Sequence, residues 1–151
     1  MKVVEQSRRD ERLNECLATR GLRFTPQRQH VYEVLRQSRD HPTAEDVFMR
    51  AKNAQPEISM ATVYNCLDAL VQCGLVKLVN RHRGATRYCA NLKEHWHFYC
   101  DACESVFDVA ATNDTARAGV ALPRGFTAER YEIAVHGRCA ACNQGRRGGP
   151  G

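Results

Sequence analysis

In most of the first ninety residues, apolar positions recur every three or four residues, which is the spacing of amphipathic helices. Capping residues mark where those helices begin. Four stretches share this spacing: 4–18, 26–38, roughly 43–54, and Ser59 to about Cys73. Thr25, Thr43 and Ser59 are favourable N-cap residues, and Gly74 suits a helix C-terminus. We therefore expect four helices in this part of the chain.

Two short apolar segments follow the last predicted helix, and a polar turn separates them. Leu75–Val79 and Thr86–Ala90 favour strands, with residues 80–85 as their connection. Three capped helices followed by a two-stranded hairpin predict a winged helix-turn-helix, which we assign to residues 1–90.

The pattern changes after residue 90 to short alternating segments interrupted by paired cysteines. The expected elements are strands at His95–Tyr99, Val106–Ala110 and Phe126–Val135 and a helix at 111–122. We expect a small α/β domain over 91–143, which makes the whole chain an α+β protein. Residues 144–151 cannot bury apolar surface, so they are predicted to form a disordered tail.

The composition is that of a folded protein. Hydrophobic residues make up 43% and charged residues 26% of the 151 positions, both ordinary globular values. No apolar run approaches the ~20 residues of a membrane-spanning helix, and the first residues contain no signal segment. We therefore expect a cytoplasmic protein without a membrane partner. Eight cysteines in that compartment indicate metal or redox chemistry rather than disulfides.

The positive charge is confined to the predicted winged helix. Residues 1–90 contain 15 Lys and Arg against 10 Asp and Glu (net +5), whereas residues 91–151 contain 7 of each (net 0). A basic helix-turn-helix suits DNA phosphates and base edges. A solvated basic surface is the alternative, which the helix order and the predicted wing disfavour. The candidate DNA-binding residues are Ser59, Thr62, Tyr64 and Asn65 on the recognition helix, with Arg23, Arg28, Arg81 and Arg83 around it.

Two Cys-x-x-Cys pairs, Cys100/Cys103 and Cys139/Cys142, are separated by 35 residues in the second part of the chain. Each pair can hold one metal ion through a tight turn, and four thiolates match tetrahedral zinc. In so small a module the zinc site supplies folding energy that the core lacks. Unrelated core cysteines and redox-active pairs are the alternatives, but two pairs on separate turns favour zinc.

A second metal site with mixed ligands is predicted from His95 and His97. Residues i and i+2 of a strand face the same side, so both imidazoles can reach one ion. Further donors are available at His41, His82, Cys89 and Asp108. Such a site would lie between the two predicted domains. A pair of surface histidines without a metal is the alternative.

Five motifs together resemble the ferric uptake regulator family over nearly the whole chain. They are GLRFTPQR at 21–28, HPTAEDVF at 41–48, ISMATVYN at 58–65, GLVK at 74–77, and the His-x-His-x-x-Cys-x-x-Cys run at 95–103. Within the family, HPTA, ATVYN and GLVK are most similar to the peroxide-stress repressors.

The resemblance implies a homodimer whose N-terminal winged helix binds double-stranded operator DNA and whose C-terminal domain dimerises. It also implies one structural Zn²⁺ per chain at the four paired cysteines and a second, regulatory ion (Fe²⁺, Mn²⁺ or Zn²⁺) at the domain junction. By position, the regulatory ligands would be His41, Cys89, His95, His97 and Asp108. The implied function is metal-dependent transcriptional regulation, expected to be repression, that responds to peroxide or metal status.

The chain departs from the family pattern at several positions. Cys89 stands where the family usually has Asp or Glu, and zinc-uptake repressors have Cys there, so a zinc-responsive repressor of zinc uptake is the alternative. Those repressors usually take another ligand where this chain has Lys77, which cannot coordinate while protonated. A third metal site is not expected, because Glu94, Trp96 and Tyr131 occupy its positions.

A zinc-dependent hydrolase or deaminase is a remote alternative. The chain lacks the His-x-Glu and Pro-Cys-x-x-Cys signature of the deaminases, a glycine-rich phosphate loop and a serine elbow. A zinc-stabilised interaction module without a DNA role would not explain why the charge excess lies on the helix-turn-helix half. We therefore expect a regulator and not an enzyme.

Overall fold

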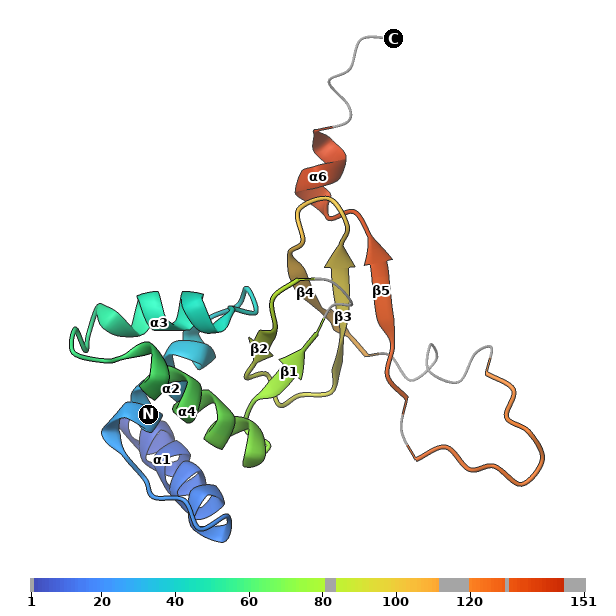
Figure 1. Cartoon of the computed structure of the whole chain (residues 1–151). Helices are drawn as coiled ribbons and strands as arrows, with labels where there is room; N and C mark the ends of the chain where they lie inside the picture. The colour runs from blue at the N-terminus through green and yellow to red at the C-terminus, as the bar shows by residue number, and fades with distance from the viewer. Residues whose placement is uncertain (1, 81–83, 112–119, 130, 146–151) are drawn as a thin grey trace. The chain divides into compact units, whose positions relative to one another are not determined.

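The structure is a computed structural model of the whole chain, and it describes residues 2–80, 84–111, 120–129 and 131–145 (Figure 1). The chain forms two compact units, Met1–Leu92 and Lys93–Gly151. Helices dominate the first unit and a sheet organises the second, which confirms the predicted α+β class. No helix among the described residues is long and apolar enough to cross a membrane.

The first unit consists of four helices followed by a two-stranded hairpin. The helices are α1 (Lys2–Thr19), α2 (Pro26–Gln37), α3 (Ala44–Lys52) and α4 (Met60–Gln72), and the antiparallel strands are β1 (Lys77–Val79) and β2 (Arg87–Cys89). The hydroxyl groups of Thr25, Thr43 and Ser59 each accept a backbone N–H three residues on, so α2, α3 and α4 begin where capping predicts.

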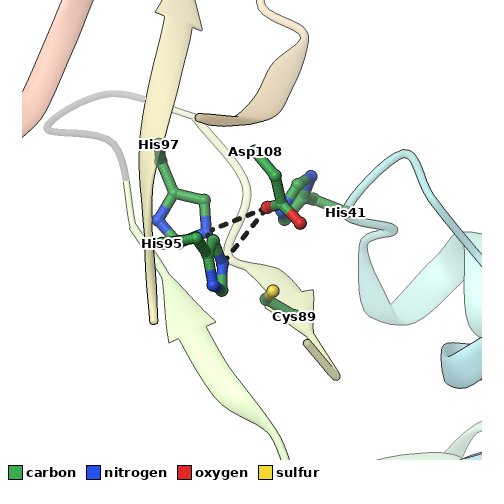
Figure 2. A group of neighbouring side chains, drawn as sticks. All are labelled: His41, Cys89, His95, His97 and Asp108. Atoms are coloured by element: carbon green, nitrogen blue, oxygen red, sulfur yellow. Dashed lines mark hydrogen bonds and ion pairs between the residues drawn. The ribbon is translucent and has the colours of Figure 1, made fainter. Parts of the chain in front are cut away.

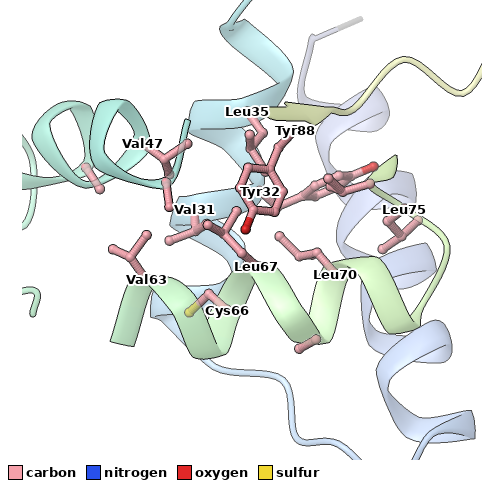
Figure 3. Close-up of a cluster of buried hydrophobic side chains, with 14 of the residues drawn as sticks. Val31, Tyr32, Leu35, Val47, Val63, Cys66, Leu67, Leu70, Leu75 and Tyr88 are labelled. Carbon is pink, nitrogen blue, oxygen red and sulfur yellow. The ribbon is translucent and has the colours of Figure 1, made fainter. Parts of the chain in front are cut away.

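Helix α4 is fixed by the core of the first unit (Figure 3). Helical spacing in the sequence predicts one buried stripe of five residues: Val63, Cys66, Leu67, Leu70 and Val71. The first four are buried, whereas Val71 is half-buried and Ala69 is buried beside the stripe. They pack with buried side chains of α1, α2 and α3 and with Tyr88 of β2. Each fully buried leucine contributes about 1.5–3 kcal/mol to this packing. Because one face of α4 is anchored in this way, the opposite face of the helix is presented to solvent.

The second unit contains a three-stranded sheet and a short helix. Its strands are β3 (His95–Cys100), β4 (Val106–Ala110) and β5 (Ala134–Gly137), in the order β4-β3-β5, and α6 (Ala140–Gln144) follows. Strand β3 is antiparallel to β4 and parallel to β5. The register places His97 directly opposite Asp108, so residues far apart in the sequence meet on neighbouring strands.

The strand predicted at Phe126–Val135 is mostly wrong. Pairing with β3 begins at Ala134, opposite His97, and ends at Gly137, opposite Cys100. Phe126 is exposed, and its N–H donates to the carbonyl of Pro123 in a turn. Gly125 provides the positive φ of 87° at that turn, which interrupts any extended segment.

Two further predictions for the second unit are only partly covered by the structure. Of the helix predicted at 111–122, residues 112–119 lie outside the described residues, and the described residues 111 and 120–122 are irregular. Gln144, the first residue of the tail predicted at 144–151, is the last residue of α6. Residues 146–151 lie outside the described residues.

Candidate metal centres and nucleic-acid interface

The four paired cysteines converge at one end of the second unit. Cys100 ends β3, Cys103 lies in the turn before β4, Cys139 caps α6, and Cys142 lies within that helix. Their sulfur atoms all lie within 4.8 Å of one another, and the Sγ atoms of Cys103 and Cys139 are 3.8 Å apart. Tetrahedral zinc with Zn–S bonds of ~2.3 Å requires S···S separations of ~3.8 Å. The cluster therefore fits a zinc ion.

Hydrogen bonds within the cluster separate the pKa values of these thiols. The backbone N–H of Cys139 donates to Sγ of Cys100 at 3.3 Å, and this bond is the main reason that the pKa of the Cys100 thiol falls to about 6. Hydrogen bonding to the neighbouring sulfur atoms, first that of Cys139, raises the pKa of Cys142 to about 12. Four thiolates at this spacing repel one another, so full ionisation needs a bound cation.

A second group of ligands lies on β3 and β4 of the same unit (Figure 2). Nε2 of His95 is 3.2 Å and Nε2 of His97 is 3.6 Å from Oδ1 of Asp108. The two Nε2 atoms are 3.1 Å apart. The strand alternation and the register opposite Asp108 thus aim three donor atoms at one point. We call His95, His97 and Asp108 the sheet triad.

The orientation of His95 is set by a backbone carbonyl. Nδ1 of His95 lies 2.6 Å from the carbonyl oxygen of Lys93. Because a carbonyl only accepts, Nδ1 donates this bond, and Nε2 is the ring nitrogen left to offer a lone pair to a metal ion. Metal-binding histidines commonly use such a carbonyl contact to fix the tautomer. The sheet triad therefore has the chemistry of a partial metal site.

The first unit contains two further candidate ligands, His41 and Cys89. Both are buried, and a ring nitrogen of His41 lies within 4.8 Å of Sγ of Cys89. The N–H of Tyr88 donates to the carbonyl of Pro42 at 3.0 Å, and Thr43 forms a β-bridge with Arg87. These backbone contacts hold the segment that precedes α3 against β2. We call His41 and Cys89 the wing pair.

His41 has an unusual backbone conformation. Its φ of 53° lies in the left-handed region, which costs a non-glycine residue roughly 1–2 kcal/mol. Nη1 of Arg87 donates to the carbonyl of His41 at 3.0 Å and supports this conformation. Sequence reasoning missed the role of Arg87, whose only signal was its place two residues before Cys89 on the same predicted strand. His82, the other metal ligand considered from the sequence, lies outside the described residues.

The predicted recognition helix presents polar side chains on its outer face. Ser59, Tyr64 and Asn65 are exposed and Thr62 is half-buried. Ser59 and Thr62 are also joined by the cap of α4, because the Thr62 N–H donates to the Ser59 hydroxyl at 3.1 Å and the two hydroxyls are 2.9 Å apart. Tyr64 and Asn65 are therefore the best placed for contact with a base edge.

The predicted arginines differ in their surroundings. Arg23 is exposed, whereas Arg28 is half-buried, and its guanidinium donates to the carbonyl of Arg23. Arg28 thus stabilises the loop between Arg23 and α2 and also contributes positive charge to it. Arg81 and Arg83 lie outside the described residues.

Comparison with known proteins agrees with this arrangement. The model of the ferric uptake regulator family matches residues 19–137. The peroxide operon regulator of Bacillus subtilis is 31% identical over 131 residues, which cover 86% of this chain and 90% of that protein. A peroxide-responsive repressor of Staphylococcus epidermidis is 29% identical and covers 89% of this chain and 93% of its own length.

Solved structures share the fold. The Helicobacter pylori ferric uptake regulator superposes with a TM-score of 0.73 over 88% of this chain and 90% of its own, at 21% identity, and its structure is described as having three functional metal-binding sites. The Campylobacter jejuni peroxide stress regulator gives a TM-score of 0.64 at 25% identity over 78% of this chain and 89% of its own.

These relatives favour the peroxide branch over the zinc-uptake alternative. The family predicted from the five motifs is confirmed, and its members are regulators rather than enzymes. The family model covers the capped helices, the wing pair, the sheet triad and the first cysteine pair together. The chain belongs to the ferric uptake regulator family.

Proposed function

We propose that the protein is a metal-dependent transcriptional repressor that binds operator DNA and releases it when peroxide disables its regulatory metal site. The observation that carries the proposal is the sheet triad, whose three donor atoms converge in a chain 31% identical to a peroxide operon regulator. Membership in a family of regulators supports the same function.

The regulatory ion would be held by the wing pair and the sheet triad together. The wing pair would supply two donors from the first unit, and the triad would supply three from the second. Two donors alone hold a divalent ion poorly, whereas five approach the coordination number of iron, manganese or zinc. A metal shared in this way would fix the two units in one arrangement, and its loss would release them.

The DNA would be bound by two copies of the chain. In a homodimer, two α4 helices would enter successive major grooves about 34 Å apart, with Tyr64 and Asn65 near the bases and Arg23 near phosphates. Arg28, Arg81 and Arg83 would add charge beside them. The positive excess of the first ninety residues supports this assignment. We further propose that dimerisation occurs through the second unit and that the protein acts in the cytoplasm.

Regulation by zinc is a second candidate, and Cys89 favours it. A buried thiol beside His41 makes the wing pair softer than a carboxylate would. Such a thiolate also offers a sulfur that peroxide can oxidise to a sulfenic acid. The two candidates therefore differ in the metal that activates DNA binding and in the ligand that is oxidised.

Fluorescence anisotropy with a labelled duplex from upstream of the protein's own gene tests the proposal. Protein that retains its structural zinc is compared after addition of Fe²⁺, Mn²⁺, Zn²⁺ or a chelator, each with and without hydrogen peroxide. The peroxide function predicts that Fe²⁺ and Mn²⁺ activate DNA binding. It also predicts that the Fe²⁺ form rapidly loses DNA binding when peroxide is added. Activation by Zn²⁺ alone would support the second candidate. Equal DNA affinity with every metal and with chelator would refute both.

A further inference from the structure

Arg50 contacts the loop that carries His41 through the two residues Ser38 and Asp40. Its guanidinium forms a two-pronged contact with Asp40, with Nη1 2.9 Å from Oδ1 and Nη2 2.6 Å from Oδ2. Nη1 also donates to the hydroxyl of Ser38 at 2.8 Å, and that hydroxyl donates to the carbonyl of Val34 at 2.7 Å. One side chain of α3 therefore ties the end of α2 to the residue immediately before His41.

His41 needs such support because of its place in the chain. It adopts a φ of 53° immediately before Pro42, where a residue normally prefers an extended conformation. After His41, the loop is held by the bond from Tyr88 to the carbonyl of Pro42. Before His41, Arg50 provides the side-chain anchor through Asp40. The left-handed turn is thus fixed at both ends, and its imidazole stays buried beside Cys89.

We propose that Arg50 is a positioning residue that sets the affinity of the regulatory metal site by holding Asp40, and through it His41, in place. The inference rests on the proposed function, in which His41 is a ligand. An ordinary surface ion pair would affect neither metal affinity nor DNA release. The third bond to Ser38 and the left-handed residue next to Asp40 distinguish this contact from such a pair.

Titration with Co²⁺ tests the role of Arg50, because the absorption of this ion reports both its coordination geometry and thiolate ligation. Full-length protein with its structural zinc in place is compared with the variants Arg50→Met, Asp40→Asn and His41→Ala. We expect Arg50→Met and Asp40→Asn each to weaken Co²⁺ binding about tenfold, as losses of supporting residues around metal sites do. Arg36→Met is the matched control, since it removes an arginine contact to Glu33 within α2 and should leave the affinity unchanged.

A double variant separates positioning from a general loss of stability. In a His41→Ala background, Arg50→Met should weaken Co²⁺ binding no further, because Arg50 acts through His41. A further tenfold loss in that background would overturn the inference, as would unchanged affinity in both Arg50→Met and Asp40→Asn. If His41→Ala itself binds Co²⁺ normally, the ligand assignment in the proposed function fails instead. Should Arg50→Met not fold, Asp40→Asn and its His41→Ala double variant decide the question.

Discussion

Replacement of Cys103 by serine should unfold the second unit while leaving the first unit folded. Among the described residues of the second unit, the buried hydrophobic ones are Tyr99, Cys100 and Val106. At about 1.5–3 kcal/mol for each large apolar side chain, their burial contributes on the order of 5 kcal/mol. Ordering the backbone costs about 1–2 kcal/mol per residue, so this small core cannot hold the unit together alone.

A bound zinc ion adds the largest single contribution to the stability of this unit. Structural zinc sites contribute an apparent ~10–16 kcal/mol to folding near neutral pH, which is comparable with the whole stability of a small domain. Serine is a poor zinc ligand, so Cys103→Ser removes one of four thiolates and most of this contribution. The first unit depends on a core of buried side chains from all four of its helices and does not use this metal.

The two units can be followed separately in one sample. Trp96 is the single tryptophan of the chain and lies on β3, so its fluorescence reports the second unit. Far-ultraviolet circular dichroism reports mainly the helices of the first. We expect Cys103→Ser to lose one zinc per chain and the native Trp96 emission while helical signal remains. Cys16→Ser, on α1, is the control and should retain both the zinc and the native Trp96 emission. A Cys103→Ser protein with native Trp96 emission and no zinc would refute the reasoning.

Three other changes test the wing pair, the recognition helix and the core. Cys89→Asp should shift metal preference from zinc toward manganese or iron with DNA binding retained, as measured by competitive metal titration; unchanged selectivity would mean that the thiol is not a ligand. Asn65→Ala should weaken operator binding by about 1–3 kcal/mol in anisotropy without altering metal affinity. Leu67→Ala should lower the free energy of unfolding of the first unit by about 2–5 kcal/mol in urea titrations, whereas Tyr64→Ala on the exposed face should change it little.

The elements that the sequence predicted well are those set by local chemistry. Capping by Thr25, Thr43 and Ser59 depends on residues within one turn, and each cap is present in the structure. The buried stripe of α4 follows from helical spacing alone. The sequence misplaces strand β5 because its extent depends on pairing with β3, a partner more than thirty residues away. Apolar alternation near Phe126 gives no information about whether a partner strand exists there.

In the candidate metal sites too, local features could be predicted from the sequence and non-local contacts could not. Paired cysteines and the His95–His97 spacing are local patterns, and each pattern places two donor atoms together, whereas the two cysteine pairs meet only in the folded unit. The supporting contacts of Arg50 and Arg87 are not local, since each joins an arginine to a loop ten or more residues away. Arginine has no preferred spacing from the backbone or carboxylate that it holds, so no sequence pattern marks it.

The two metal sites differ in what the protein requires of them. The four-cysteine cluster has uniform soft ligands and stabilises a unit with little core, so tight, permanent zinc binding serves it best. A regulatory site must instead release its ion when conditions change. The sheet triad is formed within one unit by strand register, whereas the wing pair depends on a left-handed His41 supported by two arginines. The wing pair is therefore the side of the proposed site whose geometry we expect substitution, or oxidation of Cys89, to change.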